Sequence, residues 1–277
     1  MPILKLPETV IYFEQEGKGP PILFLHGIGV VGGAWKPQTE VLKNRFSTLI
    51  MDNRGIGRSL PCNGPIQVEA MGKDAAALLE HLGWESAHVV GHSLGGVIAQ
   101  ELALQFPKRV RSLSLLCTFA SGRAGARPTP WVVWMSMRTH VGTRDMRRRA
   151  FLEMLLTKDE IAKRGTQELN AEIMPLVGRD LGDNPSIMMK QLRALGRHHA
   201  LPRLGELKST PTLVISAELD PIAGTQHGRQ LHTAIPCSRF EILRGSSHGV
   251  VLTQANEVNS RLHEFIASVE RDRIQTP

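Results

Sequence analysis

The chain has 277 residues, 42% of them hydrophobic, which suffices for one large α/β domain with an insertion or for two small domains. No segment approaches the run of about 20 apolar residues that a membrane-spanning helix needs, and the first residues lack the basic start and apolar run of a secretory signal. Three widely spaced cysteines, Cys62, Cys117 and Cys237, match neither a disulfide framework nor a zinc-binding pattern, so we expect a cytoplasmic protein that does not associate with membranes.

The formal net charge of +7 raises the question of an anionic partner. Basic residues are densest between Ser121 and Gly165, where Arg147, Arg148 and Arg149 are consecutive. A solvated helix face is the simplest interpretation of this cluster, because few aromatic side chains that would stack on bases accompany it. We therefore expect no nucleic-acid partner.

Two kinds of pattern alternate in the first part of the chain. Short apolar runs bounded by turn residues are typical of buried strands, and apolar residues at helical spacing predict helices. The predicted strands are Ile3–Leu6, Val10–Glu16, Pro21–Leu25, Phe46–Met51, Ala87–Gly91 and Val110–Cys117. The predicted helices are Gly32–Arg45, Val68–Leu82 and Leu94–Phe106. This alternation predicts an α/β fold with mostly parallel strands joined by crossover helices.

The alternation stops after Cys117 and resumes near the C-terminus. The intervening segment contains four helical stretches and no convincing strand: Thr129–His140, Thr143–Leu156, Lys158–Met174 and Pro185–His198. The later elements are the strands Thr212–Ala217 and Arg239–Leu243, the helices Thr225–Ala234 and Gln254–Glu270, and a frayed tail over 271–277. We therefore predict an α/β core formed by residues 1–120 and 203–277, interrupted by a helical insertion over residues 121–202.

The segment Gly91–Gly96 fits the pattern G-x-S-x-G, with a predicted strand before it and a predicted helix after it. A nucleophilic serine has to stand clear of the sheet on a tight strand-to-helix turn, and small neighbours prevent clashes there. The pattern alone is weak, since chance produces it in roughly one chain in ten. Its strand and helix context makes Ser93 the candidate nucleophile.

A serine hydroxyl needs a general base, and the base needs an acid that orients it. His248 follows the predicted strand that ends at Leu243, at the edge of the sheet where active sites of α/β folds gather. Asp220 follows the strand before it and is the predicted acid, with Glu218 as the alternative. In this kind of sheet the three residues follow the chain order serine, acid, histidine.

Attack on an ester or amide creates an oxyanion that needs preorganised N–H donors. One candidate is the backbone N–H of Leu94, at the start of the helix after the nucleophile. The other is the N–H of Ile28, in the loop that follows the strand Pro21–Leu25, where flanking glycines allow a close approach to substrate.

Five motifs together resemble the α/β-hydrolase family, and in particular its small cytosolic members with a helical cap. They are HGIG at 26–29, DNRGIGRS at 52–59, GHSLGG at 91–96, ELDPI at 218–222 and SSHG at 246–249, in family order across nearly the whole chain. The resemblance implies the α/β-hydrolase fold, with the insertion as its cap. It also implies that Ser93, Asp220 and His248 form a triad, that Ile28 and Leu94 form the oxyanion hole, and that residues 52–55 are structural.

Two differences from the family's sequence patterns argue against particular activities of the family. Epoxide hydrolases and haloalkane dehalogenases of the family have an aspartate nucleophile where this chain has Ser93. Proline-releasing peptidases usually have a tryptophan where this chain has Leu94. Both readings are therefore disfavoured.

The predicted helix Thr129–His140 is unusually apolar for an insertion, and the chain's methionines concentrate in the same insertion. Ordinary packing of the cap on the sheet explains this, and so does an apolar acyl-binding pocket. For the pocket, the candidate side chains are Trp131, Trp134 and Met135.

We predict a serine hydrolase that needs neither metal nor cofactor and cleaves a small ester or lactone with an apolar part. Three alternatives use the same residues: hydrolysis of a carbon–carbon bond in a diketone, acyl transfer, and slow turnover by a ligand-binding or receptor-like protein. The only partner expected is the small-molecule substrate, and the chain is expected to be a monomer or homodimer.

Overall fold

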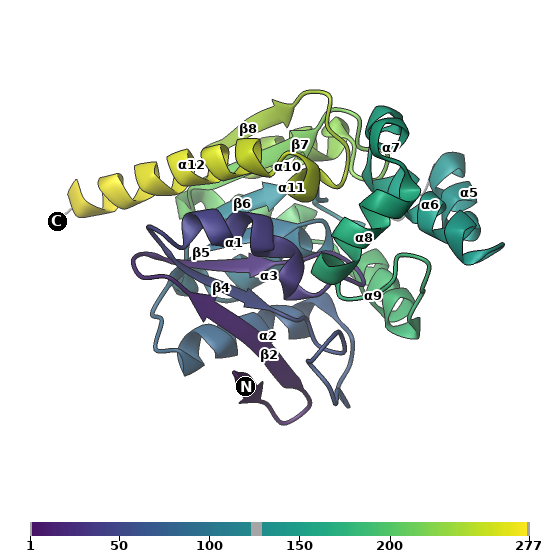
Figure 1. The fold of residues 1–277 in the computed structure, drawn as a ribbon. Helices are drawn as coiled ribbons and strands as arrows, with labels where there is room; N and C mark the ends of the chain where they lie inside the picture. The colour runs from purple at the N-terminus through teal and green to yellow at the C-terminus, as the bar shows by residue number, and fades with distance from the viewer. Residues whose placement is uncertain (1, 123–128, 276–277) are drawn as a thin grey trace.

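The computed structural model describes residues 2–122 and 129–275 (Figure 1). Its strands are β1 (Ile3–Lys5), β2 (Val10–Glu16), β3 (Pro21–Leu25), β4 (Ser47–Met51), β5 (Ala87–His92), β6 (Val110–Leu116), β7 (Thr212–Ala217) and β8 (Ser238–Leu243). They form one sheet in the order β1-β2-β4-β3-β5-β6-β7-β8. β2 pairs antiparallel with β1 and β4, and all pairs from β4 to β8 are parallel.

Helices cover the sheet and connect its strands. Those that belong to the sheet's own layers are α1 (Lys36–Leu42), α2 (Val68–His81), α3 (Leu94–Gln105), α10 (Thr225–Ala234), α11 (Val250–Thr253) and α12 (Ala255–Gln275). Short 3₁₀ turns are η1 (Gly32–Trp35), η2 (Pro107–Arg109) and η3 (Leu201–Ser209). Strands β4, β5 and β7 are buried along their whole length, because helices cover both faces of the sheet there.

The segment between β6 and β7 forms a separate helical layer. Its helices are α5 (Pro130–Arg138), α6 (Arg144–Leu155), α7 (Lys158–Arg164), α8 (Thr166–Val177) and α9 (Ser186–Arg197). They gather at one end of the molecule, at the opposite end from the C-terminus (Figure 1). We call this layer the cap. A second apolar cluster holds it together and joins α6 and α8 to Val30 and Ala34 in the segment after β3.

Two sequence predictions of helix extent were wrong. The predicted helix Lys158–Met174 is divided at Gly165, whose φ of 75° and ψ of 156° are not helical, and its second part runs on through Pro175 to Val177. The predicted frayed tail is helical as far as Gln275. Side-chain contacts between Glu270 and both His88 and Arg111 tie this end of α12 to the sheet.

None of the described helices is both long enough and apolar enough to cross a bilayer.

The loop after β4 is held by buried polar contacts. Asp52 accepts hydrogen bonds from the backbone N–H groups of Gly32 and Arg58, at 2.8 and 2.9 Å. Arg54 forms a two-pronged ion pair with Asp74 on α2, at 2.6 and 2.7 Å, and both side chains are almost fully buried. These contacts give the loop a structural role beside the site.

The pair between Arg54 and Asp74 leads to a stability prediction. Asp74→Ala leaves a buried guanidinium without its carboxylate, so the free energy of unfolding falls by about 3–5 kcal/mol. Urea denaturation at pH 7 measures the change. The control is Glu8→Gln, because Glu8 is mostly exposed and lies 3.7 Å from Arg54; it changes stability by less than about 1 kcal/mol. Equal effects of the two substitutions would contradict the prediction.

Candidate active site

Ser93 lies at a sharp turn between β5 and α3. Its φ of 55° and ψ of −121° are unusual for a residue with a side chain. The glycines around it are sterically required: a Cβ on Gly91 would lie 2.4 Å from the carbonyl oxygen of Gly95, and one on Gly95 would lie 2.0 Å from that of Leu25. Thr118, in the segment after β6, donates to the Ser93 carbonyl at 2.6 Å and holds the turn. This is the geometry expected of a nucleophile elbow.

Asp220 and His248 are in direct contact, 28 residues apart in the chain. His248 Nδ1 lies 2.8 Å from Asp220 Oδ2, and Asp220 Oδ1 accepts backbone hydrogen bonds from Ile222 and Ala223, each at 2.8 Å. Burial alone would raise the pKa of Asp220, but the charge and hydrogen bond of His248 and the two backbone donors hold it below its usual value. An ionised Asp220 keeps the proton of His248 on Nδ1 and leaves Nε2 as the basic nitrogen.

Glu218, the alternative acid, forms a different contact. Its carboxylate accepts a hydrogen bond from the backbone N–H of Gly245 at 2.8 Å, at the start of the loop that carries His248. It therefore supports that loop from outside, while Asp220 contacts the imidazole.

His92 connects the serine turn to the histidine loop. Its Nε2 donates to the carbonyl oxygen of His248 at 2.8 Å, and the two rings are 4.8 Å apart. Burial, aided by the proximity of His248, lowers the pKa of His92 to about 3, so His92 is neutral at pH 7. His26, next to His92, is buried as well, and burial lowers its pKa well below the usual value. His92 and His26 therefore add no charge to the site.

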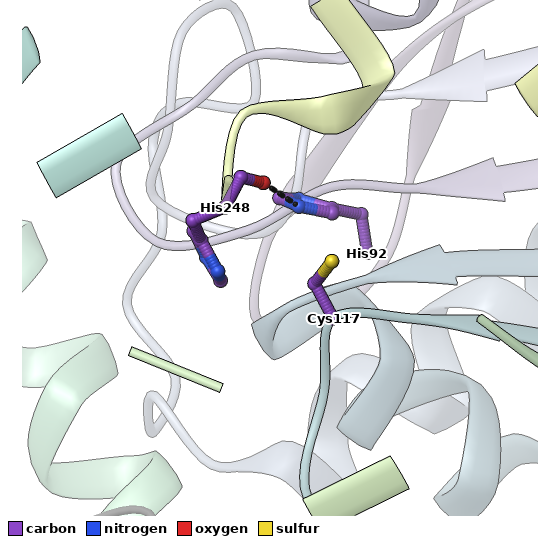
Figure 2. Close-up of side chains that lie close together, drawn as sticks. All are labelled: His92, Cys117 and His248. Atoms are coloured by element: carbon purple, nitrogen blue, oxygen red, sulfur yellow. Dashed lines mark hydrogen bonds between the residues drawn. The ribbon is translucent and has the colours of Figure 1, made fainter. Parts of the chain in front are cut away.

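Figure 2 shows His92, Cys117 and His248 close together. The atoms of these three residues that could bind a metal all lie within 4.8 Å of one another. One nitrogen of each histidine is already a donor, from His92 to the His248 carbonyl and from His248 to Asp220. A cysteine binds metal as its thiolate, but burial, followed by the charge of Asp220, raises the pKa of the Cys117 thiol well above its usual range. These residues fit a hydrogen-bonded cluster better than a metal centre.

The loop after β3 lies against Ser93, and its Ile28 is the candidate oxyanion donor. A Cβ on Gly27 would lie 3.2 Å from Ser93 Cβ and 3.5 Å from Ser93 Oγ. Among the residues that the structure describes, neither the N–H of Ile28 nor that of Leu94 donates to a protein acceptor. The Asn53 side chain donates to the His26 carbonyl at 3.1 Å and supports the loop from below. Two unpaired N–H groups beside a serine suit an oxyanion.

Ser93, Asp220 and His248 are all at least nine-tenths buried. Within the described part of the chain, the Ser93 hydroxyl has no hydrogen-bond partner, and neither has His248 Nε2. In ligand-free enzymes such contacts often tighten only when substrate binds. The structure thus leaves the serine oxygen and the basic nitrogen free for a reaction.

Helix α9 of the cap contacts the loop after β3 and the loop after β4. A Cβ on Gly29 would lie 2.7 Å from Met188 Cγ, one on Gly55 would lie 2.8 Å from Ile187 Cδ1, and Gln191 accepts a hydrogen bond from the Gly29 N–H at 2.9 Å. The sequence analysis missed these contacts. The only signal was the helical spacing of Ile187, Met188 and Gln191 on one face of a predicted cap helix.

The three pocket candidates from α5 are placed differently from one another. Met135 is buried, whereas Trp131 and Trp134 are 40% and 57% exposed. Helix α5 packs mainly on α6, toward the outer side of the cap (Figure 1). Their role in a substrate pocket stays a prediction.

Both connections between the cap and the sheet run side by side. Ser121 and His199 form an isolated β-bridge, and the N–H of Gly122 donates to the carbonyl of His198 at 2.9 Å. The His198 ring lies 2.9 Å from Glu101 on α3, the helix that begins directly after Ser93. The cap is therefore anchored to the helix that carries the serine turn.

Residues 20–164 match the family model described as the alpha/beta hydrolase fold, so the chain belongs to that family. The resemblance and the fold class predicted from the sequence are both confirmed. The chain is an enzyme of the α/β-hydrolase superfamily.

Two relatives are each named putative carbamate hydrolase RutD. The one from Azorhizobium caulinodans is 42% identical over 116 residues, which are 42% of this chain and 44% of that protein. The one from Caulobacter sp. strain K31 is 27% identical over 267 residues, 93% of this chain and 96% of that protein. The solved structure of the enol-lactonase from Burkholderia xenovorans LB400 has a TM-score of 0.80 at 24% identity and covers 96% of this chain and 100% of that one, a likeness of fold.

The contact between Glu101 and His198 predicts an acid-dependent loss of stability. Burial alone would raise the pKa of Glu101, but hydrogen bonds from His198 and Gln105 hold it at about 2, below its ordinary 4.5. A depressed pKa stabilises the fold above pH 4.5, and this contribution is lost as the pH falls from about 4.5 to about 2. When thermal unfolding is followed from pH 7 to pH 2, the melting temperature of Glu101→Gln should therefore fall less steeply in this pH window than that of wild type.

The control for this prediction is Glu206→Gln. Glu206 also pairs with a cation near the cap connection, Arg203 at 3.8 Å, but it is mostly exposed. Its profile should follow that of wild type. Parallel profiles for wild type and Glu101→Gln would contradict the prediction.

Proposed function

We propose that this enzyme is a serine hydrolase that cleaves a carboxylic ester or lactone through an acyl-enzyme, with Ser93 as nucleophile, His248 as base and Asp220 as the orienting acid. The observation that carries the proposal is the buried hydrogen bond between Asp220 and His248, beside a serine on a strained turn. A structural serine has no need of such a turn, and the Asp220–His248 pair follows β7 and β8 at the same edge of the sheet as that turn.

In the proposed reaction, His248 Nε2 takes the proton of the Ser93 hydroxyl as its oxygen attacks the substrate carbonyl. Asp220 stabilises the resulting imidazolium through Nδ1. The N–H groups of Ile28 and Leu94 bind the oxyanion. The imidazolium then gives its proton to the leaving alkoxide, and an acyl-enzyme forms. A water deprotonated by His248 releases the acid and restores the serine. These steps use only groups of the chain and water.

The proposed substrate is a small molecule with an apolar part. Ile187 and Met188 lie over the loops that flank the serine turn, and flexible aliphatic and thioether side chains adapt to varied apolar groups. The three cysteines are free in the structure, in keeping with the cytoplasm as the proposed compartment.

A carbamate is the second candidate substrate, because two relatives are named putative carbamate hydrolases. A carbamate also presents a carbonyl carbon to Ser93, with nitrogen in place of the carbon that is bonded to the carbonyl in an ester. The diketone, acyl-transfer and slow-turnover alternatives use the same three residues, so substrate assays separate them from ester hydrolysis.

Ser93→Ala tests the nucleophile. The variant should keep the wild-type melting temperature and lose hydrolysis of p-nitrophenyl esters by at least about 10³-fold, because no other hydroxyl replaces the attacking oxygen. It should also lose covalent labelling by a fluorophosphonate. Hydrolysis at the wild-type rate by the variant would overturn the proposal, and labelling of wild type without turnover on esters, lactones and carbamates would favour the slow-turnover alternative.

Asp220→Asn tests the acid. An amide in place of the carboxylate no longer fixes the proton on Nδ1 of His248, and kcat should fall by about 10³–10⁴-fold while the fold is retained. Glu218→Gln is the matched control, since Glu218 holds the same loop through a backbone N–H; its kcat should change less than about threefold. Comparable losses in the two variants would show that only the loop, and not the acid, matters.

A further inference from the structure

The residues that follow Ile28 are attached to the cap. The N–H of Gly29 donates to Gln191 Oε1 at 2.9 Å, and the carbonyl of Gly29 accepts from Arg179 Nε at 3.2 Å. The N–H of Val31 donates to the carbonyl of Val177 at 3.4 Å. Gly29 has a φ of 69°, so the loop turns there in a conformation that favours glycine. The cap therefore holds this loop through both the N–H and the carbonyl of Gly29.

Ile28 lies between a glycine that contacts Ser93 and a glycine that contacts the cap. The N–H of Ile28 lies in the peptide plane between Gly27 and Ile28, and the N–H of Gly29 lies in the next plane, which is joined to the first at the Cα of Ile28. An oxyanion donor is effective only when it is preorganised, and small displacements reduce the rate strongly. The hydrogen bond from Gly29 to Gln191 thus fixes a group that the proposed reaction uses.

Gln191 has a second feature that this support does not explain. The side chain is fully buried, and its Nε2 has no hydrogen-bond partner among the described residues. The assignment of the two amide atoms is not arbitrary, because the Gly29 N–H is a donor and requires the oxygen of Gln191 to face it. A buried amide donor without an acceptor costs about 1–3 kcal/mol.

We propose that Gln191 has two roles in the proposed hydrolase: its Oε1 positions the oxyanion loop, and its free Nε2 donates to a second acceptor oxygen of the substrate, close to the scissile carbonyl. This inference rests on the proposed function. It predicts that the enzyme prefers substrates whose acyl part carries an ether, carbonyl or carbamate oxygen over simple alkanoyl esters. Gln191 is then a positioning and specificity residue that the cap supplies.

The two roles are separable by substitution. Gln191→Met keeps the length of the side chain and removes both the acceptor and the donor. Gln191→Glu keeps an acceptor for the Gly29 N–H and, in its ionised form, removes the donor, so its assays are run over a range of pH. Arg193→Ala is the matched control, because Arg193 is on the same helix and is exposed. Circular dichroism and melting temperature establish folding of each variant.

The positioning role is measured by the second-order rate of fluorophosphonate labelling and by kcat for p-nitrophenyl butanoate. Gln191→Met should lower both by about tenfold with KM changed less than threefold, the equivalent of one hydrogen bond of about 1.4 kcal/mol. Gln191→Glu should restore labelling to within about threefold of wild type, and Arg193→Ala should match wild type. Labelling and kcat of Gln191→Met at wild-type values would overturn this role.

The donor role is measured with a pair of substrates of equal size, p-nitrophenyl methoxyacetate and p-nitrophenyl butanoate. The first has an ether oxygen where the second has a methylene, and comparison of kcat/KM ratios between variants cancels their intrinsic reactivities. The methoxyacetate-to-butanoate ratio should fall about tenfold in both Gln191 variants and stay unchanged in Arg193→Ala. An unchanged ratio in Gln191→Glu would overturn the donor role, whether or not Gln191→Met folds.

Failure of this inference is distinguishable from failure of the proposed function. If wild type neither reacts with the fluorophosphonate nor hydrolyses any ester, lactone or carbamate, the serine-hydrolase proposal fails and the inference fails with it. If wild type does both and the Gln191 variants behave like Arg193→Ala, only the inference fails.

Discussion

Close approach of backbone to backbone around Ser93 is the constraint on which the site depends. β5 has to end, reverse direction and begin α3 within a few residues, so the carbonyl oxygens of Leu25 and Gly95 lie where side chains would otherwise be. Glycines at 91 and 95 remove that obstacle, and the strain at Ser93 is held by a packed sheet and a helix whose first ten residues are buried. A rigid core thus keeps one serine in a conformation that it would not adopt alone.

The same edge of the sheet brings the other polar groups together. Parallel strands direct their carboxyl ends to one side, so the loops after β3, β5, β7 and β8 meet there. Hydrogen bonds then set their relative positions: His92 holds the carbonyl of His248, Glu218 holds the N–H of Gly245, and Asn53 holds the carbonyl of His26. The loops after β3 and β8 are thus held by side chains from neighbouring elements, and the polar groups of the site form a connected network.

The cap also contacts the core at several places around the site. α8 contributes to an apolar cluster with Val30 and Ala34, and Gln191 of α9 reaches the next turn of the same loop. The contact between His198 and Glu101 joins the end of the cap to α3. The cap therefore contacts both the helix that follows Ser93 and the loop after β3.

The sequence by itself determined much of the fold and indicated which residues belong to the site. Apolar runs bounded by turns located all the strands, and the spacing of glycines around Ser93 predicted its turn, because these patterns depend on local backbone sterics and burial. Asp220 and His248 were found because parallel strands end at one edge. Local patterns misplaced two helix ends: α12 runs past Glu270 to Gln275, and Gly165, with a φ of 75°, divides α7 from α8 although the apolar spacing continues across it. Such spacing reports which face is buried and does not by itself fix where a helix stops.

Only the tertiary structure decided which cap residues meet the site. The apolar helix α5 stands out in the sequence through Trp131 and Trp134, yet the cap side chains that contact the loop after β3 include Arg179 and, from α9, Met188 and Gln191. A polar glutamine in an amphipathic helix has no local feature that marks it as buried. Its role depends on how an inserted layer packs over a sheet more than 160 residues away from it in the chain, and long-range packing of this kind is encoded in the whole sequence rather than in any short pattern.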